Sequence, residues 1–244
     1  MATSKPSLAL DPSLAGAPLR AALVWGLGMP SCPRTLAVPD YLEELLARVR
    51  AAGDAFLEPE RKAAVRDMLR YGTYKPAGRS KPSSEYLLAA ALDGSFPLVN
   101  GPVDANNAVS LEWGYPASVF DLAKTGGELF LRRGEPGEAY VFNPSGQEID
   151  LRDLLVACRR SVGGMEPGME PGWEPGWEPC GNPVKDAMAT KVFDEARDAV
   201  AIVYAPIADP AQRLESCASR FALLLRERCG AGEAGFSIVC ASRA

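Results

Sequence analysis

The sequence predicts an α+β fold in one compact domain, with helices flanking a mixed β-sheet. The first half holds stretches in which apolar residues recur at helical spacing. The second half holds short runs bounded by turn residues, which are typical of strands. Residues 199–204 (AVAIVY) form a continuous apolar run that is typical of a central strand. With 244 residues, of which 47% are apolar, the chain can build one large core.

The N-terminal region is expected to change from loose to ordered near residue 19. Residues 1–18 are rich in Pro, Ser and Ala, and we expect a flexible segment there. Residues 19–241 are expected to form the domain, beginning with a strand over 19–26. A helix follows from Asp40, which with Glu43 makes a capping-box pattern ahead of an apolar stripe.

The other elements follow from their periodicity and their turn residues. The further expected helices cover residues 60–70, 82–92, 103–114 and 209–229. The further expected strands cover residues 119–122, 128–133, 138–142, 199–204 and 236–240.

A low-complexity insertion is expected at residues 163–181, where the unit Met/Trp-Glu-Pro-Gly is repeated nearly four times. Proline at every fourth position rules out a helix, and the glycines favour turns. One interpretation is a disordered insertion. The other is a lid or contact loop, because Trp173 and Trp177 are costly to leave in water.

Composition limits the chemistry. The chain has no histidine, which removes Ser-His-Asp and Cys-His catalysis and histidine metal sites, and we expect neither a metal nor a cofactor. Its six cysteines form no C-x-x-C pair and are expected to be free thiols. No apolar run reaches the roughly 20 residues that span a bilayer. We therefore expect a cytoplasmic protein that is not bound to a membrane. We also expect it to be a monomer.

Three segments hold candidate functional residues. Residues 103–121 (VDANNAVSLEWGYPASVFD) carry amides and carboxylates inside an apolar element, where each must be partnered or must hold a ligand. Residues 65–87 are basic, with Arg70, Lys75, Arg79 and Lys81 beside tyrosines and glycines, as in loops that bind phosphates. The alternative for this basic segment is a solvated loop in which Arg79 pairs with Glu85.

The third segment, CGNPVKDAMATK at residues 180–191, precedes the apolar run of residues 199–204. Asp186 and Thr190 lie four residues apart at a position where pocket-lining residues often occur. The alternative is a turn in which both side chains bind nearby backbone groups.

These residues resemble a known family. The run Val-Asp-x-x-Asn, then Gly-x-Pro, then Phe-Asp is similar to the B3/B4 editing domain of the phenylalanyl-tRNA synthetase β subunit, and the basic segment and residues 190–206 resemble free-standing B3/B4 proteins. The matching positions are Val103, Asp104, Asn107, Gly114, Pro116, Phe120 and Asp121. The resemblance implies a trans-editing hydrolase that deacylates a mischarged aminoacyl-tRNA. It also implies that the pocket positions a water and the terminal adenosine without a side-chain general base.

Carried over residue by residue, the resemblance implies a substrate pocket with Asn106 in place of a threonine and Ser118 in place of a histidine. Asn107 has a weaker claim to contact the substrate. Ile202 stands where the synthetase has a glutamate that recognises tyrosine, which argues against editing of tyrosine. Asp186, helped by Glu85, would instead suit a cationic side chain, such as that of the arginine analogue canavanine on tRNA(Arg).

With a tRNA as the partner, the basic segment predicts that Arg70, Lys75, Arg79 and Lys81 contact its acceptor stem. The rival hypothesis is a module that binds a free amino acid or analogue in the same pocket without hydrolysis. A net charge of −5 favours this rival, whereas the local basic segment favours tRNA. A basic path that leads to the pocket would support tRNA.

Overall fold

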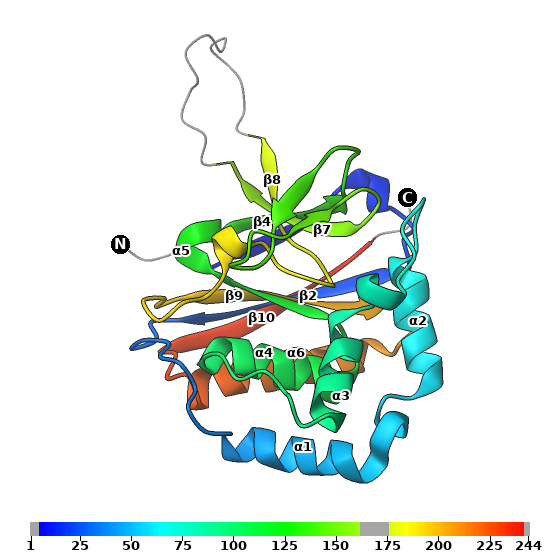
Figure 1. The fold of residues 1–244 in the computed structure, drawn as a ribbon. Helices are drawn as coiled ribbons and strands as arrows, with labels where there is room; N and C mark the ends of the chain where they lie inside the picture. Colours follow the sequence, from blue (N-terminus) through cyan, green and yellow to red (C-terminus); the bar gives the residue numbers. More distant parts are fainter. Residues whose placement is uncertain (1–4, 162–175, 242–244) are drawn as a thin grey trace.

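The computed structural model describes residues 5–161 and 176–241 of the chain. Figure 1 shows two layers of sheet above a layer of helices. The helices are α1 Asp40–Ala52, α2 Pro59–Leu69, α3 Ser83–Leu92, α4 Gly101–Trp113, α5 Leu122–Thr125 and α6 Ala211–Glu227. The strands are β1 Ser7–Leu10, β2 Leu19–Leu27, β3 Ala117–Asp121, β4 Glu128–Arg133, β5 Ala139–Val141, β6 Glu148–Asp150, β7 Leu155–Arg160, β8 Trp177–Gly181, β9 Ala199–Pro206 and β10 Glu233–Cys240. The α+β class is confirmed.

The central sheet has the strand order β10-β2-β9-β3, and every pairing in it is antiparallel. All eight residues of β9 are buried, because one face of the strand lies against the helices and the other against the second sheet. This explains the unbroken apolar run in its sequence. In this register Ser118 of β3 lies opposite Ile202 of β9.

The second sheet has the order β1-β4-β7-β8 and is mixed, since β1 pairs with β4 in parallel and the other pairs are antiparallel. A separate hairpin joins β5 to β6. The expected mixed sheet is therefore one of two four-stranded sheets rather than the whole of the β structure.

The helices cover the opposite face of the central sheet. Figure 1 shows α4 and α6 directly against the sheet, with α1 and α3 farther out and α2 along one edge. Five of the six cysteines are buried and Cys240 is exposed, and all six are free thiols as expected. No helix in the described part of the chain is long and apolar enough to cross a membrane.

The expectation of a flexible N-terminal segment is wrong for residues 7–14. Strand β1 pairs with β4, and the 3-10 turn at Pro12–Leu14 buries the side chain of Leu14, which is 1% exposed. Asp11 caps this turn, because its Oδ1 accepts from the Ser13 N–H at 2.8 Å. Strand pairing and the buried side chains of Leu8 and Leu14 therefore dock this Pro- and Ser-rich stretch on the core.

The insertion expected at 163–181 is shorter than predicted. Residues 177–181 form β8, which pairs with β7. The Trp177 ring stacks on Phe130 with their centroids 4.9 Å apart, so Trp177 belongs to the second sheet. Residues 162–175, including Trp173, lie outside the described residues, and the choice between insertion and lid stays open there.

Candidate functional site

A pocket of about 260 Å³ lies between α4, β3 and the loop of residues 182–198 that joins β8 to β9. We call this loop the pocket loop. Six of the lining residues are aliphatic: Val99, Val103, Ala117, Val119, Val184 and Val192. The polar lining residues are Ser83, Asn106, Asn107, Asn182, Lys185, Asp186 and Lys191, and Phe193 stands at the rim. The pocket thus pairs an apolar wall with a small group of polar side chains, as ligand sites do.

Helix α4 is fixed at both ends, which sets the position of its two amides. Asn100 caps its N-terminus by accepting from the Val103 N–H at 3.2 Å, and Gly114 ends it in a left-handed conformation with φ of 72°. Asp104 accepts from the Val99 N–H at 2.8 Å and from the Thr35 hydroxyl. Asp104 therefore braces the helix rather than meeting a ligand.

Asn106 lines the pocket, and its side-chain oxygen accepts no hydrogen bond from the described residues. Its Nδ2 donates over long distances, to Asn107 Oδ1 at 3.4 Å and to the Ala117 carbonyl at 3.5 Å. Its Oδ1 is buried and receives no hydrogen bond from any described residue. A buried acceptor without a donor costs about 1–3 kcal/mol, so a ligand that supplies one would gain this amount.

Asp186 also lines the pocket, and one of its carboxylate oxygens likewise receives no hydrogen bond from the described residues. Its Oδ2 accepts from the Val119 N–H at 3.3 Å, and its Oδ1 is buried without a donor in the described part of the chain. Burial raises the pKa of Asp186 to about 7, against the opposing effect of contacts with Ser118 and the Val119 amide. Gly181 makes room for this carboxylate, because a Cβ there would lie 2.6 Å from Oδ1.

Ser83, at the start of α3, gives the pocket a third unpartnered atom, its buried hydroxyl oxygen. Three of the buried side-chain atoms that lack a partner within the described residues therefore meet in one pocket. A more open hollow of about 630 Å³ lies beside the first turn of α4, and its buried carboxylate, Asp104, is fully bonded. The smaller pocket is therefore the better candidate site.

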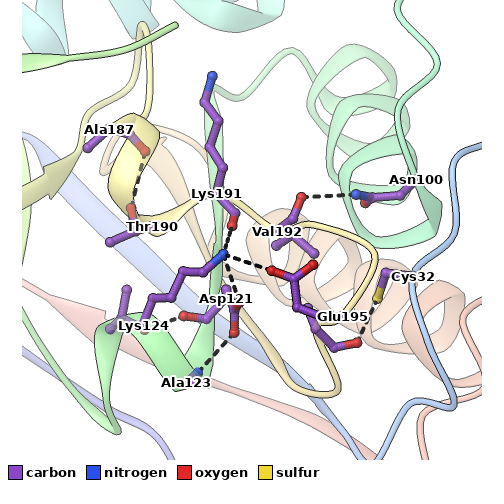
Figure 2. Close-up of polar contacts among 12 residues, drawn as sticks. Cys32, Asn100, Asp121, Ala123, Lys124, Ala187, Thr190, Lys191, Val192 and Glu195 are labelled. Carbon is purple, nitrogen blue, oxygen red and sulfur yellow. Dashed lines mark hydrogen bonds and ion pairs between the residues drawn. The ribbon is translucent and has the colours of Figure 1, made fainter. Parts of the chain in front are cut away.

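The pocket loop is tied to its surroundings at several points (Figure 2). Lys124 of α5 donates to the Lys191 carbonyl at 2.9 Å and pairs with Asp121 at 3.1 Å. Asn100 Nδ2 donates to the Val192 carbonyl at 3.0 Å, and the Cys32 thiol to the Ala196 carbonyl at 3.4 Å. The loop that carries Asp186 is thus held by α4, α5 and the chain after β2, which fixes the shape of the pocket.

The comparisons with known proteins coincide with part of this site. Residues 73–170, which hold α3, α4 and β3, match the family model described as the B3/4 domain. The chain contains a B3/4 domain. The match ends before the pocket loop, so the wall that carries Asp186 lies outside it.

The chain is related to the phenylalanyl-tRNA synthetase β subunit. It is 37% identical over 78 residues to the phenylalanine–tRNA ligase β subunit of Pseudomonas fluorescens, covering 32% of this chain and 10% of that one. It is also similar to an N-terminal fragment of the phenylalanyl-tRNA synthetase β subunit from Pyrococcus horikoshii, with 11% identity and a TM-score of 0.46. That alignment covers 97% of this chain and 51% of the fragment. The chain therefore spans a tenth of the curated relative and about half of the solved fragment.

The structure brings Asn106, Asn107 and Asp186 of the expected site residues into the pocket, but not Ser118 or Thr190. Ser118 is fully buried behind the wall, where its Oγ donates to the Asn182 carbonyl at 3.3 Å and accepts from the Tyr204 hydroxyl at 3.2 Å. The Thr190 hydroxyl donates to the Cys180 carbonyl at 3.0 Å. These two hydroxyls shape the wall of the pocket rather than its surface.

Glu85 is not in the pocket. Arg66 of α2 holds it in a two-pronged ion pair, with distances of 2.7 and 2.5 Å. The side chain of Glu85 is 10% exposed, so both of its oxygens are used where water is scarce. The expected pair between Arg79 and Glu85 is replaced by this one, and the carboxylate cannot also receive a substrate cation.

The basic segment runs up to the pocket rim. Lys75 and Arg79 are exposed, Arg70 pairs with Asp67 at 3.6 Å, and Lys81 lies 4.6 Å from the centroid of the Tyr86 ring. Ser83 follows directly, and its N–H donates to the Pro183 carbonyl of the pocket loop at 2.9 Å. The basic segment therefore runs, along the chain, into a residue that lines the pocket.

Sequence reasoning missed Asn182, Tyr140 and the two lysines that line the pocket, Lys185 and Lys191. Asn182 Oδ1 accepts from the N–H groups of Val184 and Lys185 at 2.8 and 2.9 Å, and its Nδ2 donates to the Tyr140 hydroxyl at 2.6 Å. An Asn-Pro pair after a glycine is a turn signal, and it could have marked Asn182 as the residue that shapes this loop. Tyr140 comes from the distant β5 and has no local signal.

Proposed function

We propose that this protein is an aminoacyl-tRNA deacylase that hydrolyses the ester of a mischarged tRNA in trans, after the tRNA has left its synthetase. One observation carries the proposal: Ser83 Oγ, Asn106 Oδ1 and Asp186 Oδ1 lack partners among the described residues and line one pocket, at the end of a basic segment. The relation to a synthetase β subunit supports the choice of tRNA as the partner.

The pocket suits the acyl part of such a substrate. Its aliphatic wall can pack the methylene groups of a side chain, while Asn106 and Asp186 offer two acceptors to a group rich in N–H donors. A guanidinium-like group on an apolar stem fits this combination, as in an arginine analogue such as canavanine carried by tRNA(Arg). Asp186 would act alone here, because Glu85 is engaged by Arg66.

Hydrolysis of an aminoacyl ester does not require a side chain that acts as general base. An aminoacyl ester is labile, so a water held in line with the ester carbonyl, in a pocket that fixes the acyl group, can be sufficient. The Ser83 hydroxyl, the third unpartnered group of the pocket, would orient that water, and a ribose hydroxyl of the substrate can relay the proton. This route requires no histidine, in keeping with the composition.

The rival is a module that binds a free amino acid without hydrolysis. Its specific support is the modest pocket volume of about 260 Å³, which suits a free amino acid. The basic residues leading to the rim support tRNA instead, because a free amino acid does not extend along them. A cytoplasmic location and a monomeric state stay predictions.

The test is a panel of mischarged tRNAs that differ in tRNA and in amino acid. Release of the amino acid would be measured for the wild type, for Asn106→Ala and for a control, Asn143→Ala, which lies in the turn between β5 and β6. We expect hydrolysis of some members, fastest for a cationic amino acid, and a loss of at least tenfold only in Asn106→Ala. Binding of free amino acids without hydrolysis of any ester would establish the rival.

A further inference from the structure

Two lysines of the pocket loop place their ammonium groups against one residue outside it. Lys191 Nζ donates to the Phe142 carbonyl at 2.6 Å, and Lys185 Nζ lies 3.9 Å from the centroid of the Phe142 ring. Both lysines also line the pocket. Two lysines that line the pocket therefore bring their positive charges to the same residue, Phe142, next to the turn that follows β5.

Neither ammonium has a carboxylate partner. Among the described residues, no Asp or Glu oxygen lies within 4.0 Å of Lys185 Nζ or Lys191 Nζ, whereas ten other lysines and arginines have such a partner. Asp186 is the one carboxylate of the described pocket lining. The edge beside Phe142, where the two ammonium groups lie, therefore carries positive charge, although the chain as a whole has a net charge of −5.

The backbone of both lysines is held in place, because the carbonyl group of each accepts a hydrogen bond from another residue. The Tyr140 hydroxyl donates to the Lys185 carbonyl at 2.7 Å, and Lys124 Nζ donates to that of Lys191 at 2.9 Å. Figure 2 shows the Lys191 side chain extending away from Lys124, with its carbonyl turned toward it. Fixing the backbone lowers the entropy that each side chain loses when it binds an anion.

Burial makes this arrangement unfavourable without an anion. Lys191 is partly buried, and burial lowers the pKa of its ammonium, while the charge of Asp186 acts in the opposite direction. Two ammonium groups that share a neighbour also repel each other. An anion between them would remove both costs.

We propose that Lys185 and Lys191 form a binding site for a phosphate group at the edge of the pocket. Resting on the proposed function, that phosphate is the diester on the 5′ side of the terminal adenosine, with the adenosine and its acyl group inside the pocket. A free nucleotide offers the same chemistry, and the experiment separates the two sources.

The test measures binding of three ligands that carry no ester to hydrolyse: adenosine, 5′-AMP and the dinucleotide CpA. Each is titrated into the wild type and into Lys185→Gln/Lys191→Gln by calorimetry. The control variant, Lys5→Gln/Lys62→Gln, removes the same charge from two lysines outside the pocket. Circular dichroism and thermal melting establish that each variant folds.

We expect the wild type and the control to bind CpA at least about tenfold more tightly than adenosine, and the Lys185/Lys191 variant to lose this advantage. If 5′-AMP gains as much as CpA, the site takes the phosphate of a free nucleotide; a gain for CpA alone assigns it to the end of a polynucleotide. Equal binding of CpA and adenosine by the wild type, or an unchanged CpA advantage in the variant, would overturn the proposal. A failure of ester hydrolysis would leave these results unaffected, so the two proposals fail separately.

Discussion

Replacing Asp186 by asparagine should stabilise the fold at alkaline pH while it weakens the candidate site. The pKa of Asp186 is raised from 3.8 to about 7 by burial, so the folded protein holds this proton more tightly than the unfolded chain does. The protein is therefore penalised increasingly as the pH rises from about 4 to about 7, and fully above that. About three pKa units at 1.36 kcal/mol each give about 4 kcal/mol as an upper limit.

Asparagine keeps the shape and can still accept from the Val119 N–H, but it brings a new amide donor to the position of Oδ1. We therefore expect a net gain of about 1–3 kcal/mol in the free energy of unfolding at pH 8. At pH 4 the wild-type carboxyl is neutral in the folded state, so the gain should disappear and only the cost of the new amide donor should remain.

Urea unfolding at pH 8 and pH 4, followed by circular dichroism, measures both numbers. Asp67→Asn is the matched control, because the side chain of Asp67 is 72% exposed and its loss should change stability by no more than about 0.5 kcal/mol. A variant that is less stable than the wild type at pH 8 would show that the ionised carboxylate is stabilising. A gain in stability that is equal at both pH values would show that the gain does not come from ionisation of Asp186. Either result would refute the reasoning.

Three further variants, and a kinetic assay of Asp186→Asn, test the interface, the pocket and the packing behind it. Lys75→Ala/Lys81→Ala should weaken tRNA binding and flatten its salt dependence by about one unit of slope for each phosphate that the lysines no longer neutralise; identical slopes over a salt series would remove these lysines from the interface. Asp186→Asn should lower kcat/KM about 10- to 150-fold for an aminoacyl ester with a cationic side chain and little for a small neutral one; equal losses would deny it a role in specificity. Glu85→Gln should leave both kcat/KM values within about twofold and lower stability by about 1–3 kcal/mol through loss of its charge-assisted pair with Arg66, so a loss of turnover in the folded variant would return Glu85 to the site. Gly181→Ala should reduce the yield of folded protein, because its Cβ would lie 2.5 Å from the Phe120 ring; a melting temperature equal to that of the wild type would contradict this close packing.

The elements that sequence reasoning located are those whose signals are local. Helix α4 was predicted from its apolar spacing and from the glycine that ends it, and β9 from its unbroken apolar run. Strand β8 was missed because the repeated prolines indicate a turn. It tolerates Pro179 because β8 is the edge strand of its sheet, where one side of the backbone needs no partner.

The site was predicted in part for the same reason. Asn106 was found because short polar side chains inside an apolar element are unusual and because its segment resembles a known family. Asp186 was found from its position ahead of a buried strand and from the same resemblance. Ser118 points behind the wall, and the direction of a strand side chain depends on register with β9, which the sequence does not display. Glu85 is taken by Arg66 on another helix, and its choice of partner among several nearby cations is decided by packing.

The most direct test of the central claim is the single-turnover rate of deacylation when the pocket is filled. Val99 lines the pocket and is 40% exposed, so Val99→Phe can occupy the space from the rim without disturbing the core. Val38, which is 44% exposed and does not line the pocket, supplies the control Val38→Phe. With the best mischarged tRNA of the panel, the wild type and Val38→Phe should hydrolyse the ester at equal rates and Val99→Phe at least about tenfold more slowly. Equal rates for all three would show that the ester is cleaved somewhere other than this pocket.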